Sequence, residues 1–251
     1  MKHFAKKKWG QNFLIDPNLL SKIIRTVGLS NADNVLEIGP GEGILTERIL
    51  PTVNSLAVIE IDPLLVEYLR SLDSIKGCHI IHGDVLWLEL NTLPVDRPIK
   101  IIGNIPYNIT SPILFWLIEQ REHWSEAYIM VQKEVALRLV GQVGTKAYGR
   151  LTVMTSAFLD IEKCFYIPPE VFIPRPNVDS AFIKITKKAN SIINDEQFDK
   201  FEKIVKAAFS KRRKMLQNSL SGFDIPQLLK EKIDFTRRPE TLSIAEFAEL
   251  V

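Results

Sequence analysis

The hydrophobic residues of this chain fall into short continuous runs separated by longer runs with helical spacing. Continuous apolar runs bounded by turn residues predict strands that are buried on both faces. Seven such runs occur: VLEIG (35–39), SLAVIEI (55–61), CHIIHGD (78–84), IKIIG (99–103), AYIMVQ (127–132), EKCFYI (162–167) and SAFIKIT (180–186). Helical segments are predicted after Asp16-Pro17, Asp62-Pro63 and Ser111-Pro112, where a capping residue precedes a proline at the first helical position. Two further helices are expected, over 44–50 and from 133 to 140.

Strands that alternate with helices in this way predict a parallel sheet covered by helices on both faces. We therefore expect one doubly wound, Rossmann-like α/β domain over residues 1–188. Residues 189–251 carry only helical patterns and predict a small, all-helical C-terminal domain.

Composition places the chain among ordinary globular proteins, with 251 residues, 46% of them hydrophobic and 25% charged. The longest apolar block near a helix, Ile113–Ile118, is too short to span a membrane. The basic N-terminus lacks the apolar stretch of a secretory signal. Cys78 and Cys164 lie far apart, and the four histidines show no ligand spacing with them. We therefore expect a cytoplasmic protein without a metal site or a membrane partner. We also expect a monomer.

Positive charge is concentrated at two places, although the net charge is only +2. The N-terminal segment up to residue 15 has four lysines and no acid, and the stretch FEKIVKAAFSKRRK (201–214) has six basic residues and one acid. Two basic clusters on an otherwise acidic chain indicate a surface that faces a polyanion. The alternative is a solvated, charged helix face. The candidate polyanion-binding residues are Lys7, Lys8, Lys211, Arg212, Arg213 and Lys214.

A glycine-rich turn follows the first core strand, with Gly39, Gly41 and Gly43 in sequence. The spacing differs from the G-x-G-x-x-G dinucleotide fingerprint, so a pyrophosphate cradle is not favoured. Glu60 and Asp84 end the next two strands, where their carboxylates can accept hydrogen bonds from ribose hydroxyls and from a purine amine. The glycine turn and the two carboxylates together predict an adenosyl ligand without phosphates, such as S-adenosylmethionine. Tight turns and solvated strand ends are the alternative interpretation.

The fourth core strand ends in the unusual run N-I-P-Y (104–107). The exocyclic amine of adenine is a poor nucleophile because its lone pair is delocalised into the ring. The Asn104 side-chain oxygen and the Ile105 carbonyl, presented by the rigid Pro106, are predicted to grip that amine, while Tyr107 stacks on the base. A strand that ends in a proline turn capped by Asn104 is the alternative.

Several motifs together resemble the small-subunit ribosomal RNA adenine dimethyltransferases of bacteria. They are N-I-P-Y, K-K-W-G-Q-N-F-L (7–14), K-A-Y-G-R-L (146–151), V-F-I-P-R-P-N-V-D-S-A (171–181) and F-S-K-R-R-K-M-L-Q-N-S-L (209–220). The resemblance extends from about residue 6 to the C-terminus. It implies transfer of methyl groups from S-adenosylmethionine to N6 of two adjacent adenosines in the 3′-terminal hairpin of 16S rRNA, and hence a role in rRNA processing and ribosome biogenesis on the immature 30S subunit.

The resemblance also implies roles for individual residues. The methyl donor would be held by Asn12, Leu14, Gly39, Gly41, Glu60, Asp84 and Asn104. The target adenine would be presented by Asn104, Pro106 and Tyr107, with Phe172 stacked on its other face. An aromatic residue in a proline-stiffened loop is suited to clamp a base, and an ordinary core position is the alternative for Phe172.

Two other functions compete with this prediction. A macrolide-resistance dimethylase resembles the same family but methylates adenine in large-subunit rRNA; the K-A-Y-G-R-L and F-S-K-R-R-K stretches favour the small-subunit enzyme. A non-catalytic ribosome-assembly factor that kept the fold is disfavoured by the intact Asn104, Pro106 and Tyr107.

Overall fold

The computed structural model describes residues 9–211 and 214–251, which form two compact units. The first unit comprises the residues up to Lys133 together with Glu162–Thr186, and the second comprises Glu134–Ile161 together with Lys187–Val251. The sequence pattern grouped Glu134–Ile161 with the sheet domain, whereas the structure assigns this segment to the second unit. The division of the chain at residue 188 into a sheet domain and a helical domain stays a prediction.

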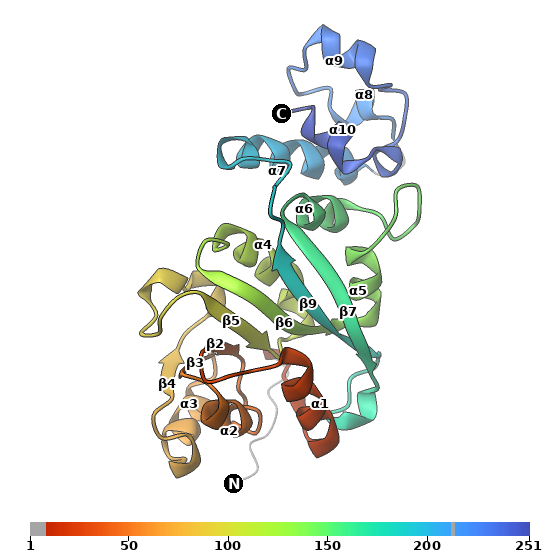
Figure 1. The fold of residues 1–251 in the computed structure, drawn as a ribbon. Coiled ribbons are helices and arrows are strands. Elements are labelled where there is room, and N and C mark those ends of the chain that lie inside the picture. The colour runs from red at the N-terminus through yellow and green to blue at the C-terminus, as the bar shows by residue number, and fades with distance from the viewer. Residues whose placement is uncertain (1–8, 212–213) are drawn as a thin grey trace. The chain divides into compact units, whose positions relative to one another are not determined.

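A seven-stranded sheet lies largely in the first unit (Figure 1), and its strand order is β4-β3-β2-β5-β6-β9-β7. The strands are β2 (Asn34–Ile38), β3 (Ser55–Glu60), β4 (His79–His82), β5 (Ile99–Gly103), β6 (Trp124–Gln132), β7 (Leu159–Ile167) and β9 (Ser180–Lys187). Strands β2 to β6 pair in parallel, whereas β9 pairs antiparallel to β6. The predicted strands are therefore all present, and the predicted doubly wound α/β fold is confirmed.

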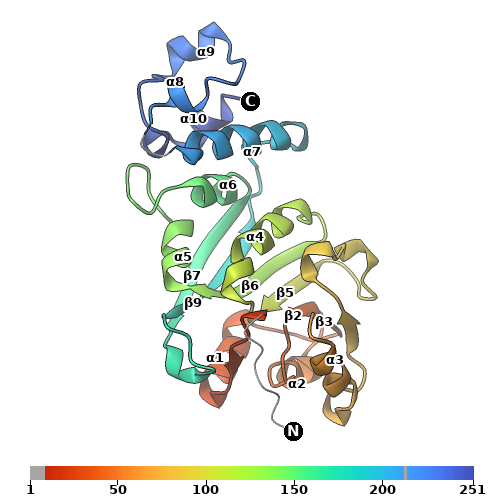
Figure 2. The same cartoon turned by 180° about the vertical axis from the view of Figure 1, so that it is seen from behind.

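Both faces of the central strands are covered, as every residue of β2 is buried. On one face, α1 (Pro17–Val27) and α2 (Thr46–Ile49) bury Leu20, Ile23 and Ile49 against inward-facing strand residues such as Val58 and Met130. Figures 1 and 2 show α4 (Thr110–Glu119) on the opposite face. Helix α3 (Pro63–Arg70) connects β3 to β4. Because the helices lie on the faces, the carboxyl edge of the sheet stays open for a ligand.

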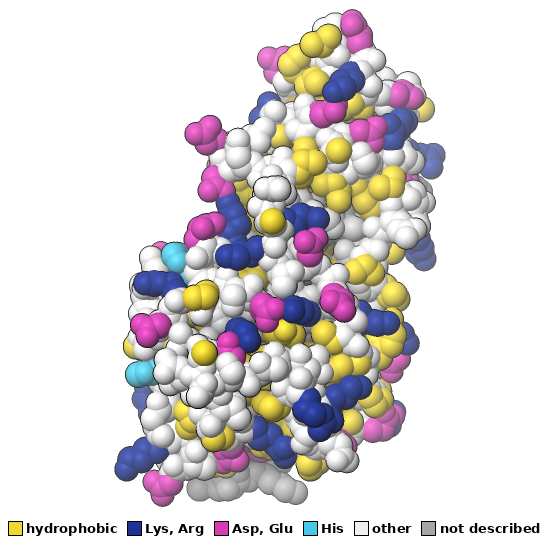
Figure 3. Space-filling view, viewed as in Figure 1, with side chains coloured by type: hydrophobic (Ala, Val, Ile, Leu, Met, Phe, Trp, Pro, Cys, Tyr) yellow, Lys and Arg dark blue, Asp and Glu magenta, His cyan; other side chains and the backbone are white. Residues whose placement is uncertain are grey.

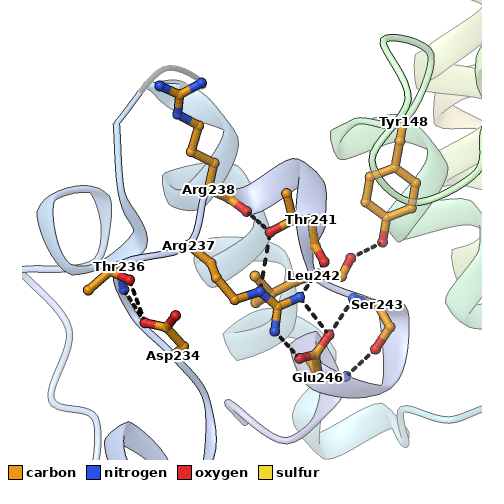
Figure 4. Close-up of polar contacts among 9 residues, drawn as sticks. All are labelled: Tyr148, Asp234, Thr236, Arg237, Arg238, Thr241, Leu242, Ser243 and Glu246. Atoms are coloured by element: carbon orange, nitrogen blue, oxygen red, sulfur yellow. Dashed lines mark hydrogen bonds and ion pairs between the residues drawn. The ribbon is translucent and has the colours of Figure 1, made fainter.

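The second unit is helical, and its helices are α5 (Lys133–Leu139, whose first residue belongs to the first unit), α6 (Arg150–Phe158), α7 (Asp195–Ser210), α8 (Leu216–Ser219), α9 (Gln227–Lys232) and α10 (Ile244–Ala248). The Phe158 ring lies 5.5 Å from that of Phe198 and 6.4 Å from that of Phe201, between centroids. The hydroxyl of the buried Tyr148 donates to the Leu242 carbonyl at 2.7 Å (Figure 4). These contacts explain why residues 134–161 belong with the C-terminal helices: their apolar residues are buried there.

Candidate functional site

A cavity opens at the carboxyl edge of the sheet in the first unit, and the glycine turn after β2 forms its floor. Gly39 and Gly41 have φ angles of +69° and +58°, a region that side-chain-bearing residues rarely adopt. A Cβ on Gly39 would lie 3.3 Å from the Asn104 carbonyl oxygen, and one on Gly41 would lie 3.0 Å from the Phe13 ring. Glycine is therefore needed here both for the turn and for the close approach of the surrounding chain.

Two carboxylates from neighbouring strands line the same cavity. Glu60 Oε1 accepts hydrogen bonds from the Ile61 and Asp62 amides at 3.0 and 2.9 Å, whereas Oε2 has only a long contact of 3.4 Å with the Gly41 amide. Asp84 Oδ1 accepts from the Leu86 amide at 3.0 Å. Glu60 is thus oriented mainly through Oε1, with Oε2 held only by the long Gly41 contact, and Asp84 is oriented through Oδ1.

The amide of Asn104 is oriented by the N-terminal segment. Its Nδ2 donates to the Asn12 carbonyl at 2.9 Å, 92 positions away in sequence. Asn12 in turn donates from its own Nδ2 to the Gly10 carbonyl at 3.2 Å. Because the NH₂ group of Asn104 is used in this way, its Oδ1 remains the free acceptor. Sequence reasoning did not find this contact, because the acceptor is a main-chain atom.

Tyr107 is anchored through its hydroxyl, which lies 2.5 Å from Ser180 Oγ. Ser180 is fully buried at the start of β9. Burial raises the pKa of Tyr107, with the bond to Ser180 acting in the opposite direction, so the phenol is neutral near pH 7. The aromatic ring is therefore held at both ends, by its backbone after Pro106 and by Ser180 at its tip.

Phe172 does not line the cavity. Its side chain is 2% exposed and belongs to the hydrophobic core with Leu20, Ile23 and Phe182. The cause is a short antiparallel pair that the sequence did not predict: β1 (Phe13–Leu14) pairs with β8 (Phe172–Ile173). Phe172 thus holds the core position of the alternative interpretation in this conformation, and its stacking on the target base stays a prediction.

All of the other predicted donor-site and target-site residues line this cavity. Its lining includes Asn12, Leu14, Gly39, Gly41, Glu60, Asp84, Asn104, Pro106 and Tyr107. Lys211 and Lys214 are exposed residues of the second unit. Lys7, Lys8, Arg212 and Arg213 lie outside the described residues.

Glu37 is a further residue of the cavity that sequence reasoning passed over, although a charged residue inside an apolar strand was a usable signal. Its Oε2 accepts a hydrogen bond from the Thr46 hydroxyl at 2.6 Å. Burial raises the pKa of Glu37 to about 7, Thr46 opposes the shift, and the nearby Glu60 adds to it.

The raised pKa of Glu37 makes stability depend on pH. Between the ordinary pKa of 4.5 and about 7, the folded state keeps a proton that the unfolded state has lost. Stability is therefore highest at low pH in this window and falls as pH rises, by up to about 3 kcal/mol. Glu37→Gln should flatten this dependence in urea unfolding measured at about pH 5 and about pH 8. The exposed Glu89→Gln serves as the control, and an unchanged slope in Glu37→Gln would contradict the assignment.

The charge of the cavity restricts the ligand. Its lining carries Glu37, Glu42, Glu60 and Asp84, and within residues 9–211 and 214–251 no Lys, Arg or His lines it. A phosphate ligand normally requires cations or a helix N-terminus, whereas an acidic site suits a cationic one. The described part of the chain contains no group of three or more His, Cys, Asp or Glu that could hold a metal ion. None of its helices has the length and apolar character to cross a membrane.

The model of one protein family, described as ribosomal RNA adenine dimethylase, matches residues 2–251 of this chain. Among curated proteins, the ribosomal RNA small subunit methyltransferase A of Prosthecochloris aestuarii is 42% identical over 98% of this chain and 92% of its own length. The protein of the same name from Saccharophagus degradans is 40% identical over 99% of this chain and 94% of its own length.

Solved structures agree with these matches. A dimethyladenosine transferase from Plasmodium falciparum superposes with a TM-score of 0.80 at 27% identity, over 95% of each chain. The 23S rRNA methyltransferase ErmE superposes with a TM-score of 0.71 at 28% identity, over 95% of this chain and 98% of its own.

Proposed function

The chain belongs to the ribosomal RNA adenine dimethylase family, and on that premise we propose that it dimethylates N6 of two adjacent adenosines in the 3′-terminal hairpin loop of 16S rRNA. The methyl donor is S-adenosylmethionine. The enzyme acts as a monomer on the immature 30S subunit in the cytoplasm, as a step of ribosome biogenesis. The observation that carries this proposal is the Asn104 amide, fixed by the Asn12 carbonyl at the rim of an acidic cavity that no described cation lines.

The residues of the cavity fit S-adenosylmethionine. Gly39 and Gly41 would allow close approach of the ligand to the backbone, and Glu60 Oε2, held only by the long Gly41 contact, would accept from the ribose hydroxyls. Asp84 would accept from the adenine amine of the donor. Asn12 and Leu14 close the cavity from the N-terminal side. When bound, S-adenosylmethionine supplies an electrophilic methyl group and an already activated sulfur leaving group.

Asn104 acts on the target adenine. Its Oδ1 and the Ile105 carbonyl accept the two hydrogens of the exocyclic amine, which draws the nitrogen toward tetrahedral geometry and frees its lone pair for attack. Because the positions are fixed before the substrate arrives, little reorganisation is needed. The amine loses a proton to water after it is methylated, so the site needs no strong base. Tyr107, held by Ser180, stacks on the base.

The substrate adenosine must leave its stack to enter this cavity, which costs a few kcal/mol and less in a loop than in a helix. The second unit offers cations for holding the RNA backbone. We include Arg238 with Lys211 and Lys214, because the Leu216 amide donates to the Arg237 carbonyl at 2.9 Å and so joins the two segments. Arg237 itself is occupied by an ion pair with Glu246 (Figure 4). Arg238 is exposed, its side chain is directed away from that pair, and no described residue forms an ion pair with it.

The two adjacent arginines should behave differently when each is replaced by alanine. Arg238→Ala should weaken RNA binding, reduce the slope of log affinity against log salt by about 1, and leave thermal stability unchanged. Arg237→Ala should lower the melting temperature, because Glu246 loses its ion-pair partner. Glu246 also accepts from the Ser243 amide at the N-cap of α10, so that contact is weakened as well. Salt titrations of RNA binding and thermal unfolding measure both effects. An unchanged salt slope in Arg238→Ala would contradict the phosphate contact.

Methyl transfer to purified, unmethylated ribosomal subunits tests the proposal as a whole. The expected product is N6,N6-dimethyladenosine in small-subunit rRNA, identified by mass after digestion to nucleosides. Label on the large subunit instead would favour the macrolide-resistance activity, for which the similarity to ErmE is the supporting observation. Binding to small subunits without transfer would favour a non-catalytic assembly factor.

A further inference from the structure

A tyrosine flanked by two lysines lies near the end of β7, in the first unit. Tyr166 is 42% exposed. The Lys163 Nζ lies 4.4 Å and the Lys133 Nζ 4.9 Å from the centroid of its ring. The core of the fold does not require this arrangement, since the ring and both ammonium groups are open to solvent.

A continuous series of contacts connects Tyr166 and its two lysines to Tyr107, the residue proposed to stack on the target base. Lys133 follows the carboxyl end of β6, which pairs in parallel with β5, the strand directly followed by Asn104. Its Nζ lies 3.0 Å from Asp179 Oδ2, and its amide donates to the Asp179 carbonyl at 2.9 Å. The next residue, Ser180, holds Tyr107. Tyr166 therefore lies on the same edge of the sheet as the site where the adenine enters.

Other side chains of this edge share the same mixed character. Ile173 at the end of β8 and Val178 between β8 and β9 are 57% and 43% exposed. Figure 3 shows Lys, Arg and hydrophobic side chains side by side over the part of the first unit where β7 and α1 lie. The acids nearby are Asp179, which pairs with Lys133, Glu170, which pairs with Arg175, and Glu162 on β7 itself. Lys163 has no ion pair among the described residues and supplies the uncompensated charge.

We propose that Tyr166, Lys163 and Lys133 form a platform for a nucleotide that flanks the target adenosine in single-stranded RNA. The proposal rests on the proposed function, because an extruded adenosine leaves its neighbours unstacked beside the cavity. Surfaces that bind single-stranded RNA combine an aromatic ring for stacking with cations for the phosphates. An exposed cation–π contact is weaker than base stacking, so an arriving base can displace a lysine from the ring. The displaced ammonium group then binds the adjacent phosphate.

Steady-state kinetics on unmethylated small subunits, with the full chain, test this platform. Tyr166→Ala should raise KM for the subunit about 10-fold, as expected for a lost stacking contact, and leave kcat and the Kd of S-adenosylmethionine unchanged. Tyr166→Phe keeps the ring and should behave like the wild type. Lys163→Gln should reduce the salt slope of RNA binding by about 1. The control is Trp87→Ala, which removes an aromatic residue that is 87% exposed next to β4, at the opposite end of the sheet.

The outcomes separate the platform from the proposed function. If the wild type methylates small subunits and Tyr166→Ala keeps the wild-type KM, the platform is refuted while the proposed function stands. An equal rise of KM in Trp87→Ala and Tyr166→Ala also refutes a specific role for Tyr166. If the wild type methylates neither subunit, the proposed function fails and the platform fails with it. Thermal unfolding of each variant shows that an altered KM does not come from misfolding.

Discussion

Replacing Asn104 with alanine is expected to lower the rate of methyl transfer by about 100-fold or more, because one preorganised group that acts on the reacting amine is removed. The affinity for S-adenosylmethionine should change much less, since the proposed donor site also includes Glu60, Asp84 and the glycine turn, which line the same cavity. Single-turnover transfer rates and donor titration by calorimetry measure the two quantities separately.

Asn108→Ala is the matched control for this variant. Asn108 is an exposed asparagine four residues further along, and it is not part of the cavity lining. Its replacement should leave the rate near that of the wild type. A near-normal rate in Asn104→Ala, with the protein folded, would show that the amide does not act on the target base.

Replacing Glu60 with alanine is expected to weaken binding of S-adenosylmethionine by about 10- to 100-fold, the effect of losing a charged acceptor for two ribose hydroxyls. The transfer rate at saturating donor should remain close to normal, because Glu60 does not contact the target adenine. Calorimetric titration with donor, and kcat at high donor concentration, measure this split.

The Glu60 variant also needs a test of folding, since its carboxylate accepts the Ile61 and Asp62 amides. Glu60→Gln keeps an acceptor oxygen and should bind donor with intermediate affinity. Glu67→Ala, at an exposed position of α3, is the control. Unchanged donor affinity in a folded Glu60→Ala protein would contradict the ribose contact.

The amino-acid sequence by itself determined the strands, the doubly wound fold and the convergence of Gly39, Glu60, Asp84 and Asn104. These follow from local information: buried parallel strands are continuous apolar runs, and the carboxyl ends of adjacent parallel strands must meet at one edge. A residue that ends such a strand is therefore placed by counting along the chain, without knowledge of its distant neighbours.

Only the tertiary structure decided which side chains are free to act. Phe172 is covered because β8 pairs with β1, and the Asn104 amide is oriented by a carbonyl 92 residues away. Of two consecutive arginines, Arg237 is paired with Glu246 and Arg238 remains exposed. The physical reason is the same in each case: burial and pairing depend on contacts between segments far apart in sequence, which the pattern of hydrophobic residues does not encode.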